Sequence, residues 1–344
     1  MYLGYYQQEE FHEIEKFVKS SWGRDIFAKK RSVNIEDLYT YIEIEIERKS
    51  APELLNVRQQ LLKLIQSVLI NSEKKLKAPE GEYNRLVSRL NQNDTIITFN
   101  WDLLLDNILG REAIDKQSDK FVNAREQYPQ YINFKYNLSA HSEWQAAHAR
   151  IKEPYEIWTS DLGYYLKLHG SVDWFYCSNE NCYSWQKVFP LLDSTIDVFC
   201  SECHEKLDIL IIPPILNKGY RSYPLIRRIW NLASQEIRSA SEIIIWGYSL
   251  PPTDFYSAWL LRQGREASLE KLVIINPEVI YPNSKKVNDK FVDKFRDLFS
   301  DKIPKGSPLL YENFSDYLDA MTVKMKYSIG EIKVTAASPS DISN

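Results

Sequence analysis

The residues with the clearest chemical pattern are the four cysteines of the chain. Four residues separate Cys177 from Cys182, 17 residues follow, and two residues separate Cys200 from Cys203. Two close pairs joined by a loop allow two tight turns to converge on one tetrahedral ion. Unrelated free cysteines would be scattered, so we favour a structural zinc site whose four thiolates leave no position for water. The neighbouring His204 is a weaker alternative ligand.

A second set of polar residues follows short apolar runs of strand length. Such runs lie at residues 95–99, 165–168, 209–212, 242–246 and 272–275. Runs that are apolar on both faces and separated by helical stretches indicate a parallel sheet covered on both sides. Ligands bind beyond the carboxyl ends of the strands in such sheets. The candidate ligand-binding residues at these ends are Asn100, Asp102, His169, Gly247, Ser249 and Asn276.

Each of these residues also has a plain structural interpretation. Asn100 or Asp102 could cap the next helix, and a single histidine such as His169 is usually structural. Asn276, which precedes Pro277, could form a simple turn. The concurrence of four such strand ends on one edge of a sheet favours a ligand site over these separate explanations.

Helical periodicity dominates the first third of the chain. Phe11, Ile14 and Val18 fall on one helical face, and a second helix is predicted from Ile35 onwards. Residues 42–46 alternate as a strand would, but the longer pattern favours a helix. A third helix follows, with a proline in the favourable first position at residue 52.

These patterns predict an α/β protein. Its Rossmann-like parallel sheet is flanked by helices and carries an inserted helical subdomain and a small zinc-ribbon module. The expected parts are a discontinuous nucleotide-binding domain at 1–110, 160–172 and 207–305, a helical insertion at 111–159, the zinc module at 173–206, and a C-terminal helix with a frayed tail at 306–344.

The composition is that of an ordinary globular protein. The 344 residues are 44% hydrophobic and 26% charged, with a formal net charge of -4. No apolar run approaches the roughly 20 residues that span a bilayer, and the first residues do not resemble a signal peptide. Nucleic-acid binding requires a basic face, which this net charge argues against. We therefore expect a cytoplasmic protein that binds neither membranes nor nucleic acid.

Taken in order, the motifs resemble those of the sirtuin family. Thr98-Phe99-Asn100-Trp101-Asp102 is similar to the sirtuin motif Thr-Gln-Asn-Ile-Asp. Leu168-His169-Gly170-Ser171 is similar to the His-Gly motif, and the paired cysteines follow it as they do in sirtuins. Residues 247–254 and 273–276 resemble later nucleotide-contacting segments. The resemblance spans about residues 32–299 and is closer to bacterial sirtuin-like NADase domains of antiphage defence than to classical deacetylases.

The resemblance implies binding of NAD and cleavage of the bond between nicotinamide and ribose. It assigns catalysis to Asn100 and His169, whose side chains we expect to face a cleft. A neutral imidazole would accept a proton from a ribose hydroxyl or a water, and the amide would orient that group. Ser249 and Asn276 would hold the phosphate and the adenosine ribose. The implied cofactor-binding residues are Thr98, Asp102, Gly247, Ser249 and Asn276.

One motif of the family is not found. Sirtuins cradle the NAD diphosphate with a Gly-Ala-Gly-x-Ser loop, whose glycines let the backbone approach the phosphates. The early glycines here, Gly4 and Gly23, lie in no such pattern. Either an upstream segment carries the loop or the protein has lost it. The filled Asn100 and His169 positions favour an upstream segment.

Three functional hypotheses remain. The leading hypothesis is a defence-type NAD hydrolase, inactive if the diphosphate loop is missing. The alternatives are an NAD-dependent protein deacylase, and a sirtuin-like scaffold that binds a nucleotide or partner without turnover. The sequence leaves open whether an effector or sensor protein, or a second copy of the chain, binds to it.

Overall fold

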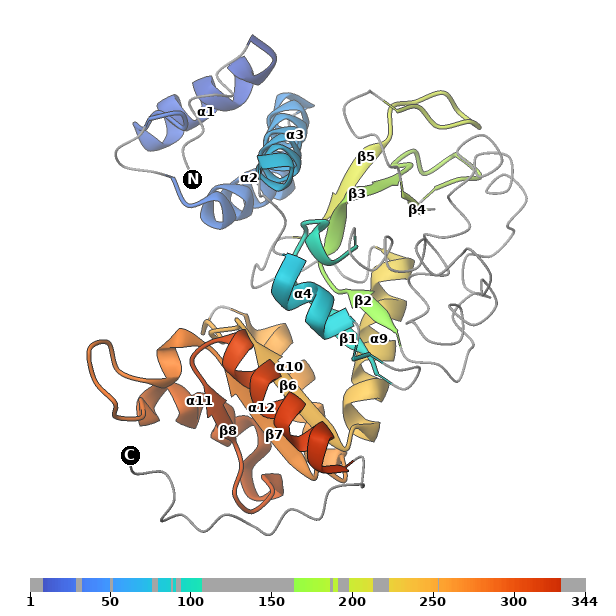
Figure 1. Cartoon of the computed structure of the whole chain (residues 1–344). Coiled ribbons are helices and arrows are strands. Elements are labelled where there is room, and N and C mark those ends of the chain that lie inside the picture. The colour runs from blue at the N-terminus through green and yellow to red at the C-terminus, as the bar shows by residue number, and fades with distance from the viewer. Residues whose placement is uncertain are drawn as a thin grey trace. The chain divides into compact units, whose positions relative to one another are not determined.

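The chain divides into two units along its sequence. The first comprises Met1–Glu236 and Pro251–Leu260, and the second comprises Ile237–Leu250 and Leu261–Asn344. The structure is a computed structural model that describes residues 9–28, 33–49, 52–75, 80–87, 89–90, 94–106, 164–185, 188–190, 198–212, 223–252 and 254–328 (Figure 1). Within these ranges, no helix is long and apolar enough to cross a membrane.

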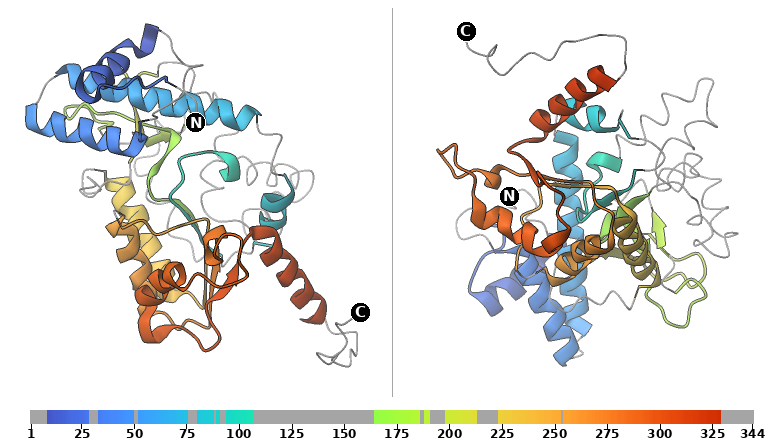
Figure 2. Two further views of the ribbon diagram at one scale, coloured as in Figure 1. Left: turned by 90° about the vertical axis from the view of Figure 1, so that its left-hand side faces the viewer. Right: turned by 90° about the horizontal axis from the view of Figure 1, so that it is seen from below.

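The first unit begins with helices. Figures 1 and 2 show α1 and α2 beside the long helix α3. Gly23 ends α1 in a left-handed conformation (φ 60°) and donates its N–H to the carbonyl of Lys19, a common helix C-cap. The bounds of these elements are Glu9–Phe11 (η2), His12–Trp22 (α1), Ile35–Lys49 (α2), Pro52–Lys75 (α3) and Glu80–Val87 (α4). The three predicted helices are confirmed.

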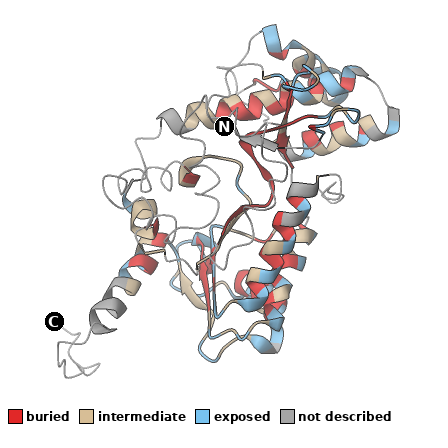
Figure 3. Cartoon of the chain, turned by 90° about the vertical axis from the view of Figure 1, so that its right-hand side faces the viewer, coloured by how far each residue is buried: buried red, intermediate tan, exposed pale blue. Residues whose placement is uncertain are grey.

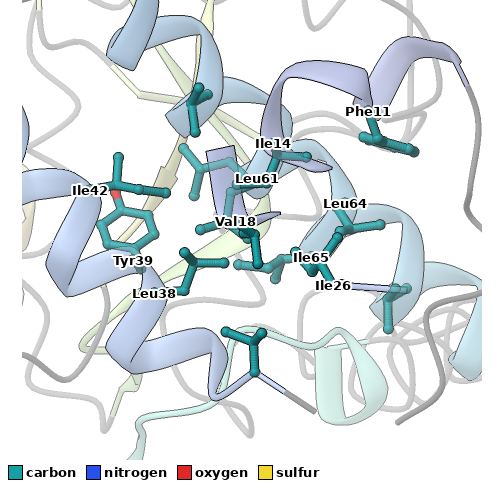
Figure 4. Packing of buried hydrophobic residues seen from close by; sticks show 14 of the residues in the cluster. Phe11, Ile14, Val18, Ile26, Leu38, Tyr39, Ile42, Leu61, Leu64 and Ile65 are labelled. Atoms are coloured by element: carbon teal, nitrogen blue, oxygen red, sulfur yellow. The ribbon is translucent and has the colours of Figure 1, made fainter. Parts of the chain in front are cut away.

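The alternating residues 42–46 are helical because of their packing. Leu38 and Ile42, one helical turn apart, are both fully buried. They lie in one apolar cluster with Ile14 and Leu61 (Figure 4). Val172 belongs to the same cluster. The helical layer therefore shares its core with the strand that follows His169.

The described residues of the first unit form two small sheets. Strands β1 (Ile96–Thr98) and β2 (Tyr165–Lys167) pair in parallel. Strand β3 (Gly170–Tyr176) lies between β4 (Val188–Pro190) and β5 (Asp208–Ile211) and is antiparallel to both. All seven residues of β3 are buried, as the red colouring in Figure 3 shows.

One strand expectation is corrected by this pairing. The apolar run at 209–212 was expected in the parallel sheet, but β5 pairs antiparallel with β3 and belongs to the cysteine module. The close approach depends on Gly170, whose φ is 76° and where a Cβ would overlap the carbonyl oxygen of Leu210. An apolar run alone does not reveal which strand will be its partner.

The second unit contains a parallel sheet in the order β6-β7-β8. Its central strand β7 is buried from Leu272 to Ile275, which explains its continuous apolar sequence. Helix α12 covers part of the sheet, because Phe314 stacks on Trp246 with ring centroids 3.8 Å apart. The bounds are Glu242–Trp246 (β6), Lys271–Ile275 (β7), Leu309–Tyr311 (β8), Pro277–Val279 (η7), Asp289–Phe299 (α11) and Phe314–Ser328 (α12).

The remaining helices come before and after β6 in the chain. Helix α9 (Pro224–Ser239) precedes β6, and α10 (Phe255–Arg262) and η6 (Gln263–Glu266) follow it. The predicted C-terminal helix corresponds to α12, whereas the three-residue strand β8 was not anticipated. The predicted helical insertion at 111–159 lies outside the described residues.

Candidate functional site

The four cysteines converge in the first unit. Their Sγ atoms all lie within 4.8 Å of one another. The Sγ atoms of Cys177 and Cys203 are 3.7 Å apart, as are those of Cys182 and Cys200. A tetrahedral zinc ion with Zn–S bonds of about 2.3 Å requires sulfur atoms about 3.8 Å apart, whereas a disulfide requires about 2.05 Å. The cluster therefore fits zinc, and none of the four forms a disulfide.

Tight turns of the backbone at Cys182 and Cys200 position their sulfur atoms in the cluster. Cys177 follows the last residue of β3, and the carbonyl of Cys182 accepts the N–H of Trp185 at 2.9 Å. The carbonyl of Cys200 likewise accepts the N–H of His204 at 2.9 Å. His204 is exposed and is not in the converging group, so the described residues place four cysteines, without the histidine, around the site.

The electrostatics of the cluster also suit a cation. Burial raises the pKa of the Cys177 thiol above its usual value, because a buried thiolate is costly without a nearby positive charge. A divalent cation would supply that charge and hold the thiols as thiolates. With four sulfur ligands the site leaves no open coordination position, so its role is structural.

Asn100 and His169 follow neighbouring parallel strands. The register pairs Thr98 with Lys167, and the N–H of Leu168 donates to the carbonyl of Thr98 at 3.0 Å. Both residues therefore lie beyond the carboxyl ends of β1 and β2, as the sequence predicted. Asn100 is exposed.

The surroundings of His169 correct one expectation. We expected its side chain to face a cleft, but it is only 2% exposed. Its ring lies 5.3 Å from the ring of Phe99 and 6.2 Å from that of Trp230, between centroids. The indole Nε1 of Trp230 also donates to the carbonyl of Leu168 at 3.0 Å. Aromatic packing from α9 thus covers the histidine.

Thr98 and Asp102 make local hydrogen bonds that shape the loop. The Thr98 hydroxyl accepts the N–H of Asn100 at 3.1 Å. The Asp102 carboxylate accepts the N–H of Leu104 at 3.1 Å and so caps the next turn. This hydrogen bond agrees with the capping interpretation of Asp102.

The second unit groups the other three candidates. Gly247 follows β6 with a φ of 68°, and its N–H donates to the carbonyl of Ile275 at 2.9 Å. The buried Asn276 side chain accepts the N–H of Glu278 at 2.9 Å. Its Nδ2 donates to the carbonyl of Tyr248 at 3.4 Å. Ser249 is partly exposed. The structure thus brings Gly247, Ser249 and Asn276 together around one turn.

Three important residues were missed by the sequence reasoning. Lys167 and Asp106 form a fully buried ion pair with an Nζ–Oδ2 distance of 3.1 Å. Trp230 covers His169. The sequence did contain a signal for the ion pair, because Lys167 interrupts an otherwise apolar strand. Trp230 lies 62 residues after the carbonyl that it binds, and its helical position alone gave no indication of that contact.

Comparisons with known proteins complete the description. No protein-family model and no curated protein matches the sequence. Among solved structures, a mutant Sir2 homologue in complex with 2'-O-acetyl-ADP-ribose is 12% identical, with a TM-score of 0.45 over 93% of this chain and 92% of that chain. A Sir2 homologue bound to NAD is 12% identical, with a TM-score of 0.40 over 82% of this chain and 77% of that chain. Sir2 in complex with an inhibitor, 2'-O-acetyl-ADP-ribose and a deacetylated peptide is 13% identical, with a TM-score of 0.38 over 90% of each chain.

Proposed function

We propose that this protein binds NAD and hydrolyses the bond between nicotinamide and ribose, as a sirtuin-like NADase of the kind found in antiphage defence. The observation that carries the proposal is the parallel pairing of β1 with β2. It sets Asn100 and His169 at the same end of adjacent strands, in the order that the motif resemblance requires.

The chemistry suits these two side chains. Cleavage of the nicotinamide–ribose bond builds positive charge on the sugar, so the enzyme must orient the ribose hydroxyls and a water. The exposed amide of Asn100 would hold a ribose hydroxyl or the attacking water. A neutral imidazole at His169 would accept a proton from one of these groups.

The turn of the second unit by itself offers groups that suit a phosphate and a ribose. A Cβ added to Gly247 would meet no atom within 4 Å, so the backbone there is open to a phosphate. Ser249 would donate to that phosphate. The side chain of Asn276 already holds the turn in place, so it would act by shaping the site as well as by contacting the ribose.

The test measures nicotinamide release from NAD, with and without an acetylated peptide. Release without the peptide supports the hydrolase, and release only with the peptide supports the deacylase. In a form of the hydrolase that has a complete diphosphate loop, Asn100→Ala and His169→Ala should each lower release at least about 100-fold. The exposed Asn231 on α9 offers a matched control, because Asn231→Ala should leave release unchanged. Normal release by either site variant would refute the assignment.

The burial of His169 favours a second candidate, a domain that binds the nucleotide without turnover. At 2% exposure the imidazole reaches a substrate only if the covering residues rearrange. This candidate predicts NAD binding in titration, no nicotinamide release under either condition, and no change in affinity in His169→Ala.

A further inference from the structure

Strand β2 carries a fully buried charged residue. The side chains of Lys167 and Asp106 are both 0% exposed, and their charged atoms are in contact. Lysine and aspartate are almost never fully buried unless they are paired, because burial removes the water that stabilises their charge. The position lies two residues before His169, yet neither the zinc site nor the proposed chemistry uses it.

The hydrogen bonds of this pair form a closed network. The Lys167 ammonium donates to both carboxylate oxygens of Asp106, at 3.3 and 3.1 Å. It also donates to the backbone carbonyl of Asp102 at 2.5 Å. The Tyr165 hydroxyl donates to Asp106 at 2.9 Å. An ammonium has three hydrogens, so all three have acceptors here.

Stability alone does not explain such a pair. An apolar pair of similar volume often stabilises a protein as well or better, because it has no desolvation cost. What an apolar pair cannot do is hold the carbonyl of Asp102. That carbonyl ends the loop that begins after β1 and carries the exposed Asn100.

We propose that Lys167 and Asp106 are positioning residues that fix the loop from Phe99 to Asp102 against β2, so that Asn100 is held beside the strand end that carries His169. The positioning role in catalysis rests on the proposed function, whereas the tether itself does not. Asp106 orients the ammonium, and the ammonium holds the loop through the Asp102 carbonyl. This tether acts together with two local hydrogen bonds. The N–H of Asn100 donates to the Thr98 hydroxyl, and the N–H of Leu104 donates to the Asp102 carboxylate.

The first test separates the tether from general stability. The double variant Lys167→Met/Asp106→Leu removes both charges together and leaves no unpaired buried ion. Its thermal midpoint should stay within a few degrees of that of the parent. Amide hydrogen exchange in the peptide covering residues 99–104 should nevertheless become at least about tenfold faster, because the loop opens more often. Unchanged exchange in that peptide at an equal midpoint would overturn the proposal.

Two further variants keep this test decisive. Tyr165→Phe removes a hydrogen bond to the same carboxylate but leaves the Asp102 contact, so exchange of residues 99–104 should remain as in the parent. If the apolar double variant does not fold, Lys167→Met/Asp106→Asn removes the ammonium donor and keeps a neutral amide that can still accept from the Tyr165 hydroxyl. It should fold and show the same faster exchange, and parent-like exchange would contradict the tether.

The kinetic test addresses positioning. In Lys167→Met/Asp106→Leu, kcat for nicotinamide release should fall at least tenfold while KM for NAD stays within twofold, because neither substitution removes a residue that is expected to contact NAD. A merely structural role would leave kcat unchanged in the folded protein, and that result would overturn positioning. A parent protein that releases no nicotinamide even when a diphosphate loop is supplied refutes the proposed function instead, and the exchange experiment still decides the tether.

Discussion

The ring of Trp230 lies 6.2 Å from that of His169, at an angle of 28°, while its indole Nε1 donates to the carbonyl of Leu168. Helix α9 thus both covers the candidate catalytic histidine and holds the strand end that carries it.

Changes at Trp230 should separate these two effects. Trp230→Phe keeps an aromatic ring but loses the hydrogen bond, and should lower the free energy of unfolding by about 1 kcal/mol. Trp230→Ala also leaves a cavity and should cost about 3–5 kcal/mol. Urea unfolding measures both values. Equal losses in the two variants would show that packing around His169 contributes nothing beyond the hydrogen bond.

Zinc content tests the cysteine cluster. The purified protein should contain about one zinc ion per chain, as four-thiolate sites do. Cys200→Ser or Cys203→Ser should release the metal and lower the thermal midpoint, because metal binding is coupled to folding of the module. Ser201→Ala, an exposed change between the two ligands, should retain zinc. Elemental analysis that finds well-folded, metal-free parent protein would rule out the site.

Alanine substitutions of two glycines, one in β3 and one in α4 as a control, test the pairing of β3 with β5. Gly170→Ala places a Cβ onto the carbonyl of Leu210 at a φ of 76°, so it should cost more than about 2 kcal/mol of stability. Gly81 in α4 has open space around it, and Gly81→Ala should be neutral or stabilising by up to about 1 kcal/mol. Denaturant midpoints of the two variants provide the comparison. Parent-like stability of Gly170→Ala would contradict the pairing of the two strands.

Buried tyrosines predict sensitivity to alkali. Burial raises the pKa values of Tyr165 and Tyr176 well above their usual value, so both stay protonated in the folded chain. In the unfolded chain they ionise near pH 10. Their contribution is therefore fully present below pH 10 and is lost as the pH rises further, by about 1.4 kcal/mol per pH unit for each tyrosine.

The measurement is the free energy of unfolding between pH 8 and 11. Tyr176→Phe should make the decline above about pH 10 less steep. An exposed residue, Tyr183, serves as the control, because Tyr183→Phe should leave the slope unchanged. A parent protein whose stability is flat across this range would contradict the burial of these hydroxyls.

NAD affinity tests the missing diphosphate loop. Gly23, one of two early glycines, is used to end α1, and so it does not serve a phosphate. Charge-assisted hydrogen bonds are worth about 1.5–3 kcal/mol each, so losing two or three should weaken binding by a factor between about a hundred and about a million, if the losses add. We expect calorimetric titration of this 344-residue chain to give a dissociation constant weaker than micromolar. Micromolar affinity would show that another segment supplies the phosphate site.

The sequence by itself determined the features that depend on local spacing. Two cysteine pairs specify a four-sulfur site whatever surrounds them, and the helices at Ile35–Lys49 and Pro52–Lys75 follow from periodicity and a proline. Apolar runs that end in polar residues also located β1, β2, β6 and β7. Burial on both faces explains the run in β7, whereas β6 alternates between exposed and buried residues although its sequence is apolar.

Only the tertiary structure decided which of these parts meet. The apolar run at 209–212 pairs antiparallel with β3. This pairing depends on Gly170 in β3, and the composition of the run itself does not determine it. His169 became buried because Trp230, 61 residues later in the chain, packs on it. Lys167 and Asp106 are also 61 residues apart in the sequence. They form an ion pair in the core, because a buried charge is costly without a partner of opposite charge. Such contacts arise from long-range packing, which local residue patterns do not encode.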